Sequence, residues 1–169
     1  MSNDIISVIA NIALALSFIV GLIFGIVQVR ASARDRRERL TLETLREFHT
    51  HEFIGLMHFI IYRDMPSTRE GMTALPVVDQ TNLIQFAQEM ESLGILVAEH
   101  LINIDLVDKT LGSFVTLAWE KYKTLFLDIR KNQPDPYLGE YFQWLAERIE
   151  ERMQKNPRRP FYELNVSAI

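Results

Sequence analysis

Histidine is the side chain best suited to metal binding or acid–base chemistry in a chain without cysteine, and this chain has four: His49, His51, His58 and His100. A helical zinc-protease motif needs two histidines four residues apart, and no pair among the four has that spacing. His49 and His51 are two residues apart, so on a helix their side chains point about 200° apart and cannot share a metal ion. We therefore predict no metal site and no thiolate nucleophile.

Arg46 and His51 form a pattern that resembles a known catalytic site. The segment Arg46-Glu47-Phe48-His49-Thr50-His51 fits the loose Arg-x4-His pattern of the HEPN ribonucleases, all-helical domains in which paired Arg and His serve RNA cleavage. With thirteen arginines and four histidines in 169 residues, a match this loose is expected about once by chance. In a continuous helix Arg46 and His51 also diverge by about 140°. We predict a non-enzymatic protein, with these two residues as the catalytic candidates of the alternative, a membrane-tethered RNA-cleaving or RNA-binding domain.

Composition excludes several other classes of function. The net charge is −4, which is not the global basicity of a nucleic-acid binder, so we do not expect nucleic acid as a partner. No glycine-rich loop that could cradle phosphate and no G-x-S-x-G nucleophile elbow is present. We therefore predict no cofactor.

The element that must position everything else is the uncharged segment 5–29, IISVIANIALALSFIVGLIFGIVQV. As a helix, its 25 residues extend about 37 Å, which is enough to cross a ~30 Å hydrocarbon core with some tilt. No Lys or Arg precedes it, whereas a basic segment follows it: Arg30, Arg34, Arg36, Arg37 and Arg39. Because basic residues stay in the cytoplasm, we expect a single-pass protein of the inner (plasma) membrane with its N-terminus outside.

A cleavable signal peptide is the competing interpretation of this segment. Ala31-Ser32-Ala33 is similar to a cleavage site. However, the basic start of a signal peptide is missing and the apolar run is too long. We therefore expect an uncleaved anchor.

One face of this helix carries small and polar residues. At 100° per residue, an arc of about 120° contains Ser7, Ala10, Asn11, Ser17, Gly21, Gly25 and Gln28, with larger apolar residues such as Leu14 and Phe18 among them. Helices in hydrocarbon gain no hydrophobic energy by associating, so their packing depends on small residues, and Ser17-x3-Gly21-x3-Gly25 is such a row. Asn11 lies roughly 9 Å from the centre of the span, where an unpaired amide is costly. We predict a homo-oligomer, dimer or ring, with Asn11, Ser17, Gly21 and Gly25 at its interface.

Residues 30–64 are predicted to continue this helix into a folded domain. Gly and Pro are absent from residues 30–50, and Arg, Glu and Leu favour helix. Helical spacing is shown by Leu42, Leu45, Phe53, Leu56 and Ile60. Residues 65–80 carry two prolines and a glycine and are predicted to be a loop, either a surface crossover or a functional, mobile element.

Residues 81–155 are predicted to form three further helices. The first carries the core stripe Leu83, Phe86, Met90, Leu93, Val97 and Leu101. The second begins at Asn103 or Asp105 and carries the stripe Val107, Leu111, Phe114, Ala118, Tyr122, Leu125 and Ile129. The third begins at Asp135, with Pro136 as its first helical residue. Residues 156–169 form a tail that packs back or binds a partner. We predict an all-α fold: one transmembrane helix continuing into a cytoplasmic bundle of about four helices.

The segment MESLGILVAEHLINIDLVDKTLGSFVTLAWEKYKTLFLDIRKNQ resembles an uncharacterised family of small bacterial single-span membrane proteins with a helical domain of unknown function. The likeness is strongest over residues 86–145, and the most suggestive positions are Glu91, Gly94, Trp119 and Arg130. This family implies no catalytic residues. The layout is also loosely similar to the pore-forming, single-span membrane accessory of RNA-targeting CRISPR systems, which implies a pore candidate.

These observations predict a membrane-anchored protein that associates with copies of itself through its transmembrane helix. Its cytoplasmic bundle would mediate assembly or recognise a cytoplasmic protein partner. As an effector, the protein would form a small pore or perturb the membrane in another way. Besides the RNA-directed alternative, a monomeric tether for a protein partner would fit the same sequence without self-association.

Overall fold

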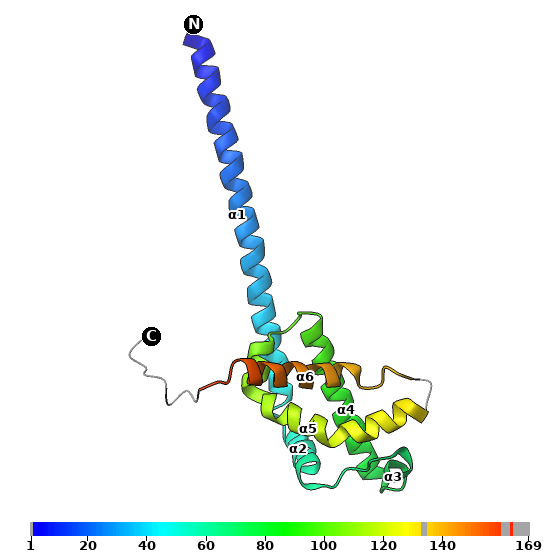
Figure 1. Cartoon of the computed structure of the whole chain (residues 1–169). Helices are drawn as coiled ribbons and strands as arrows, with labels where there is room; N and C mark the ends of the chain where they lie inside the picture. The colour runs from blue at the N-terminus through cyan, green and yellow to red at the C-terminus, as the bar shows by residue number, and fades with distance from the viewer. Residues whose placement is uncertain (1, 133–134, 160–162, 164–169) are drawn as a thin grey trace. The chain divides into compact units, whose positions relative to one another are not determined.

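The computed structural model describes residues 2–132, 135–159 and 163, and within them every regular element is a helix, which confirms the all-α fold class (Figure 1). The helices are α1 (Ser2–Glu47), α2 (His51–Tyr62), α3 (Arg69–Thr73), α4 (Val77–Ala98), α5 (Ile104–Asn132) and α6 (Glu140–Lys155). The chain divides into two compact units, Met1–Leu40 and Thr41–Ile169. The first unit is the apolar and basic part of α1, and the second is a helical bundle.

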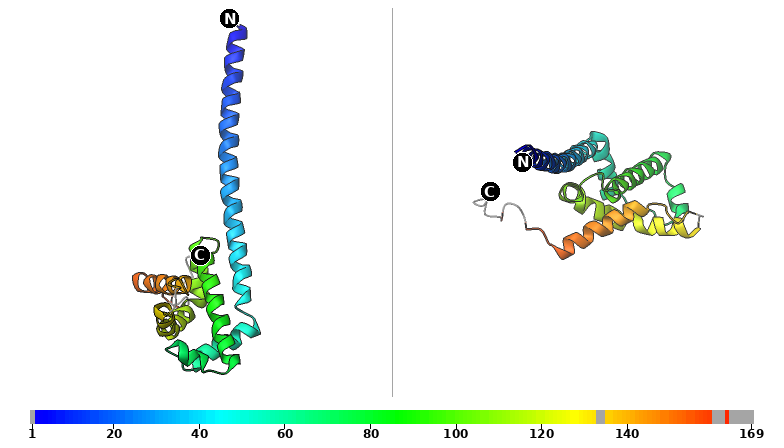
Figure 2. Two further views of the ribbon diagram at one scale, coloured as in Figure 1. Left: turned by 90° about the vertical axis from the view of Figure 1, so that its right-hand side faces the viewer. Right: turned by 90° about the horizontal axis from the view of Figure 1, so that it is seen from above.

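The core of the second unit is a cluster of aromatic rings. Phe86 on α4 is at its centre, with its ring centroid 5.6 Å from Phe114, 5.5 Å from Tyr122 and 6.1 Å from Phe142. α6 packs against both α4 and α5 (Figure 2), so three helices close over these rings. The two core stripes predicted between Leu83 and Ile129 are buried except for two positions: Leu101 is half exposed because α4 ends at Ala98, and Ile129 is only partly buried. Of the apolar positions predicted by helical spacing over residues 30–64, Leu42 is exposed.

The helix predicted over residues 30–64 is two helices, not one. α1 ends at Glu47, and α2 begins at His51 with Thr50 as its N-cap. The backbone of Thr50 is extended, and its hydroxyl oxygen accepts a hydrogen bond from the Phe53 amide at 3.2 Å. The break lets Phe48 and Phe53 pack edge to face, 4.8 Å apart, inside the bundle. The prediction failed because a threonine cap can end a helix without glycine or proline.

The loop predicted over residues 65–80 is partly helical. It contains α3, whose first turn is capped by the Thr68 hydroxyl, which accepts from the Gly71 amide at 3.1 Å. α4 also begins at Val77, before the predicted residue 81, directly after Pro76. Proline is well suited to this place because the first amides of a helix have no intrahelical acceptor.

The predicted caps of the last two helices have different outcomes. Asn103 does cap α5: its side-chain oxygen accepts from the Asp105 amide at 2.8 Å. Asp135 does not cap α6. Its carboxylate accepts from the Tyr137 amide at 3.0 Å and forms a turn, and α6 begins only at Glu140, after Gly139.

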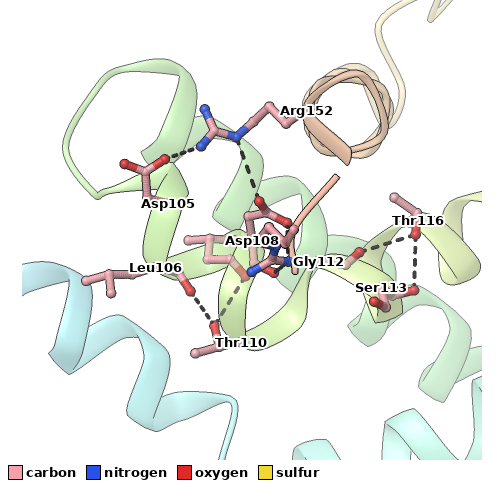
Figure 3. A network of polar contacts seen from close by, with 10 residues as sticks. Asp105, Leu106, Asp108, Thr110, Gly112, Ser113, Thr116 and Arg152 are labelled. Atoms are coloured by element: carbon pink, nitrogen blue, oxygen red, sulfur yellow. Dashed lines mark hydrogen bonds and ion pairs between the residues drawn. The ribbon is translucent and has the colours of Figure 1, made fainter. Parts of the chain in front are cut away.

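The described part of the C-terminal tail is held against the start of α5. Arg158 donates to the carboxylate and to the carbonyl oxygen of Asp108, each at 2.9 Å. Asp105 and Asp108 both face Arg152 of α6 (Figure 3). The carboxylate of Asp108 lies against Gly112, where a Cβ atom would come within 2.6 Å of its oxygen. Arg158 therefore ties the start of the predicted tail to α5, although residues 156–159 are exposed; the rest of the tail, apart from residue 163, lies outside the described residues.

Candidate functional site

The first candidate site is the apolar part of α1. The large apolar side chains between Ile5 and Val29 have exposed fractions of 46–72%, and no described side chain from Ile5 to Arg36 is buried. Soluble monomers rarely expose a contiguous apolar patch of more than a few hundred Å². This helix is long and apolar enough to cross a membrane. Its surface needs an apolar environment or other helices.

The small-residue face is open on this helix. A methyl group added at Gly21 or at Gly25 would meet no atom within 4 Å outside the helix itself, and Asn11 and Ser17 are exposed. Because α1 is continuous from Ser2 to Glu47, these four residues fall on one face, as the spacing predicts. The face is therefore free to receive another helix closely.

The basic segment follows on the same helix. Arg30, Arg34 and Arg36 are exposed, and the Arg34 Nε donates to the Glu38 carboxylate at 2.9 Å. This hydrogen bond, together with the charge of Glu38, raises the pKa of the Arg34 guanidinium above its ordinary value. A fixed positive charge immediately after an apolar span is suited to anionic lipid headgroups.

Arg46 and His51 lie on different helices, on either side of the break at residues 48–50. The divergence expected for one continuous helix therefore does not apply. Both side chains are exposed, and among the described residues no hydrogen bond, ion pair or ring contact joins them. The structure thus does not assemble an Arg–His pair by direct contact.

The positions that carry the resemblance meet around the start of α6. Glu91 of α4 accepts hydrogen bonds from the backbone amides of Tyr141, at 3.3 Å, and Phe142, at 2.8 Å. The Nε of Arg130 on α5 donates to the Leu138 carbonyl at 2.7 Å. Gly139, the N-cap residue, has no side chain to accept these amides. A carboxylate from another helix therefore supplies the cap of α6.

Close backbone packing and aromatic contact complete this arrangement. At Gly94 a Cβ atom would lie 2.3 Å from the Tyr141 carbonyl oxygen, so only glycine lets α4 approach α6 this closely. The Trp119 ring lies 5.3 Å from the ring of Phe142. Glu91, Gly94, Trp119 and Arg130 thus hold α6 in place, a role that sequence reasoning did not assign to them.

Replacing Glu91 with Ala is expected to lower the free energy of unfolding by about 1–2 kcal/mol, because two amides at the start of α6 lose their acceptor. Denaturant unfolding of the full chain in detergent measures this loss. Glu120→Ala is the matched control, because Glu120 is exposed and, among the described residues, pairs with Lys123 alone. It should change stability by less than about 0.5 kcal/mol. Equal losses in the two variants would contradict the capping role.

Comparison with known proteins identifies a family. The model of a family described as a domain of unknown function, DUF4760, matches residues 15–149. The match begins within the apolar part of α1 and extends into α6, so it covers residues of both units. No curated protein and no solved structure matches the chain.

Proposed function

Because this chain belongs to the DUF4760 family of domains of unknown function, which supplies no activity to carry over, we propose a function from its own residues. The protein is a non-enzymatic component of the bacterial inner membrane that associates with copies of itself through α1. Its helical bundle lies in the cytoplasm and mediates assembly or binds a protein partner there.

The observation that carries this proposal is the exposure of every apolar residue of α1 between Ile5 and Val29. About 37 Å of helix without a buried side chain cannot remain in water as a monomer, whereas a lipid bilayer accepts it. The arginines on its C-terminal side then favour insertion with the N-terminus outward.

Self-association is supported by the open small-residue face. Small residues at Ser17, Gly21 and Gly25 let two helix backbones approach closely, and no atom outside the helix lies within 4 Å of a Cβ added at either glycine. The amide of Asn11 gains hydrogen-bond partners from a neighbouring copy that hydrocarbon cannot offer. A dimer would use this face alone, and a ring would use it as a repeated seam around a small pore.

The insertion and its direction can be tested with single cysteines, because the natural chain has none. We expect Ser2→Cys to react with a membrane-impermeant maleimide added to intact spheroplasts. Lys109→Cys, at an exposed position of α5, should react only in inside-out vesicles. Labelling of Lys109→Cys from outside would reverse the direction, and recovery of the chain in aqueous extract without detergent would contradict insertion altogether.

A further inference from the structure

A groove of about 420 Å³ lies between the end of α1, the start of α2 and α4. Its lining has two parts of different chemistry. The apolar lining is formed by Phe48, Phe53, Leu93 and Leu96, and the acidic lining by Glu47, Glu52 and Glu89. All these residues belong to the second unit, so the groove is a property of the bundle itself.

The acidic side of the groove has no basic partner. The side-chain amide of Gln85 donates to the carboxylates of Glu52, at 2.8 Å, and Glu89, at 3.2 Å. Within the described part of the chain, none of the three groove glutamates forms an ion pair with Lys or Arg. Desolvation by burial raises the pKa of Glu89, and the charge of Glu52 raises it further. The groove therefore gains from an occupant that brings a positive charge.

Arg46 lies at the end of α1, on the side of the helix that faces away from the groove. Its side chain is exposed and makes no hydrogen bond or ion pair among the described residues. Thr44, Glu47 and Phe48 are the residues of this turn that line the groove. At 100° per residue, Arg46 points about 150° away from their mean direction. One bundle thus presents the cation and the acidic groove on opposite sides.

We propose that the groove binds Arg46 of a second copy of this chain. The guanidinium bonds Glu52 and Glu89 together, and its methylene groups cover the apolar lining. Arg46 and the groove residues Thr44, Glu47 and Phe48 belong to one helical turn, so each bundle presents both halves of the contact. Each copy then gives its arginine to one neighbour and receives the arginine of the other. Such a head-to-tail contact closes into a ring when the rotation between neighbouring copies divides a full turn, and we include that closure in the proposal.

This inference rests on the proposed self-association and adds its geometry. A two-fold dimer cannot satisfy it, because the donor and the acceptor of one copy face opposite ways. The small-residue face alone is compatible with either a ring or a dimer, and the groove contact selects the ring.

The test exchanges the two charges between copies, using the full chain in mild detergent and its mass by light scattering. Arg46→Glu alone and Glu89→Arg alone should each reduce the mass of the assembly by at least half. Arg46→Glu brings a third carboxylate to Glu52 and Glu89, and Glu89→Arg places a second guanidinium against Arg46. Co-expression of the two variants should restore the wild-type mass, since each new charge then meets an opposite one. Lys109→Glu makes the same charge change at an exposed lysine of α5 and should leave the mass unchanged.

Tryptophan fluorescence establishes that each variant is folded. If folded Arg46→Glu retains the wild-type mass, or if co-expression restores nothing, the groove contact is wrong. A wild-type dimer would also overturn it, while leaving self-association intact. A wild-type monomer would overturn self-association and the groove contact together.

Discussion

Gly94→Ala is expected to lower the free energy of unfolding of the bundle by about 3 kcal/mol or more. The added Cβ would lie 2.3 Å from the carbonyl oxygen and 2.6 Å from the carbonyl carbon of Tyr141. Both are backbone atoms at the start of α6, so no side-chain rotation relieves the overlap and α6 must move away from α4. A domain with a total stability of 5–15 kcal/mol would lose a large share of it.

Tryptophan fluorescence during denaturant unfolding measures this effect in the full chain, because Trp119 and Trp144 both belong to the bundle. Gly55→Ala makes the same chemical change in α2, where a Cβ meets nothing within 4 Å. That control should stabilise the bundle by about 0.5–1 kcal/mol, because alanine favours helix over glycine. Similar values for the two variants would mean that α4 and α6 do not touch at Gly94.

Helical periodicity predicted the fold class because burial of one face follows directly from spacing. Leu83, Phe86 and Tyr122 are buried at positions that a 3.6-residue repeat assigns to the core. The ends of helices depend instead on single hydrogen bonds. Thr50 divides the helix predicted over residues 30–64 by accepting one hydrogen bond from a backbone amide. The composition of the neighbouring residues does not predict this break.

The start of α6 shows why part of the structure could not be predicted. Asp135 and Pro136 carry the local signature of a helix start, yet the helix begins later, where Glu91 supplies the cap from 50 residues away along the chain. Gly139 adopts a left-handed conformation, with φ of 69°, and its Cβ would strike the Phe126 ring at 2.6 Å. Contacts between distant residues thus override local propensity.

The candidate functional residues also fall into two groups: those that local spacing predicts and those that depend on tertiary contacts. Exposure of the apolar helix and the small-residue face follow from periodicity alone, because no tertiary contact competes with them. The proposed role of Arg46 depends on a groove formed by α1, α2 and α4, which spacing cannot reveal. Sequence patterns therefore located the helix that is long and apolar enough to cross a membrane, whereas the charged surface of the bundle could be interpreted only from the folded structure.

Replacing both Gly21 and Gly25 with Ile is expected to reduce the detergent-solubilised assembly to single chains of 19.7 kDa plus bound detergent. Branched side chains on this face keep two helix backbones from approaching, and hydrocarbon provides no compensating hydrophobic energy. Light scattering in mild detergent measures the mass. The replacement leaves the rest of the chain undisturbed, because no atom outside the helix lies within 4 Å of either added Cβ.

Two control variants separate loss of the small face from added bulk. Ile23→Phe with Val27→Phe enlarges the opposite face of the same helix and should leave the assembly intact. Gly21→Ala with Gly25→Ala keeps the face small and should retain most of it. If the isoleucine variant keeps the wild-type mass while remaining in the membrane, self-association does not use this face, and the contacts that hold copies together must then lie in the bundle.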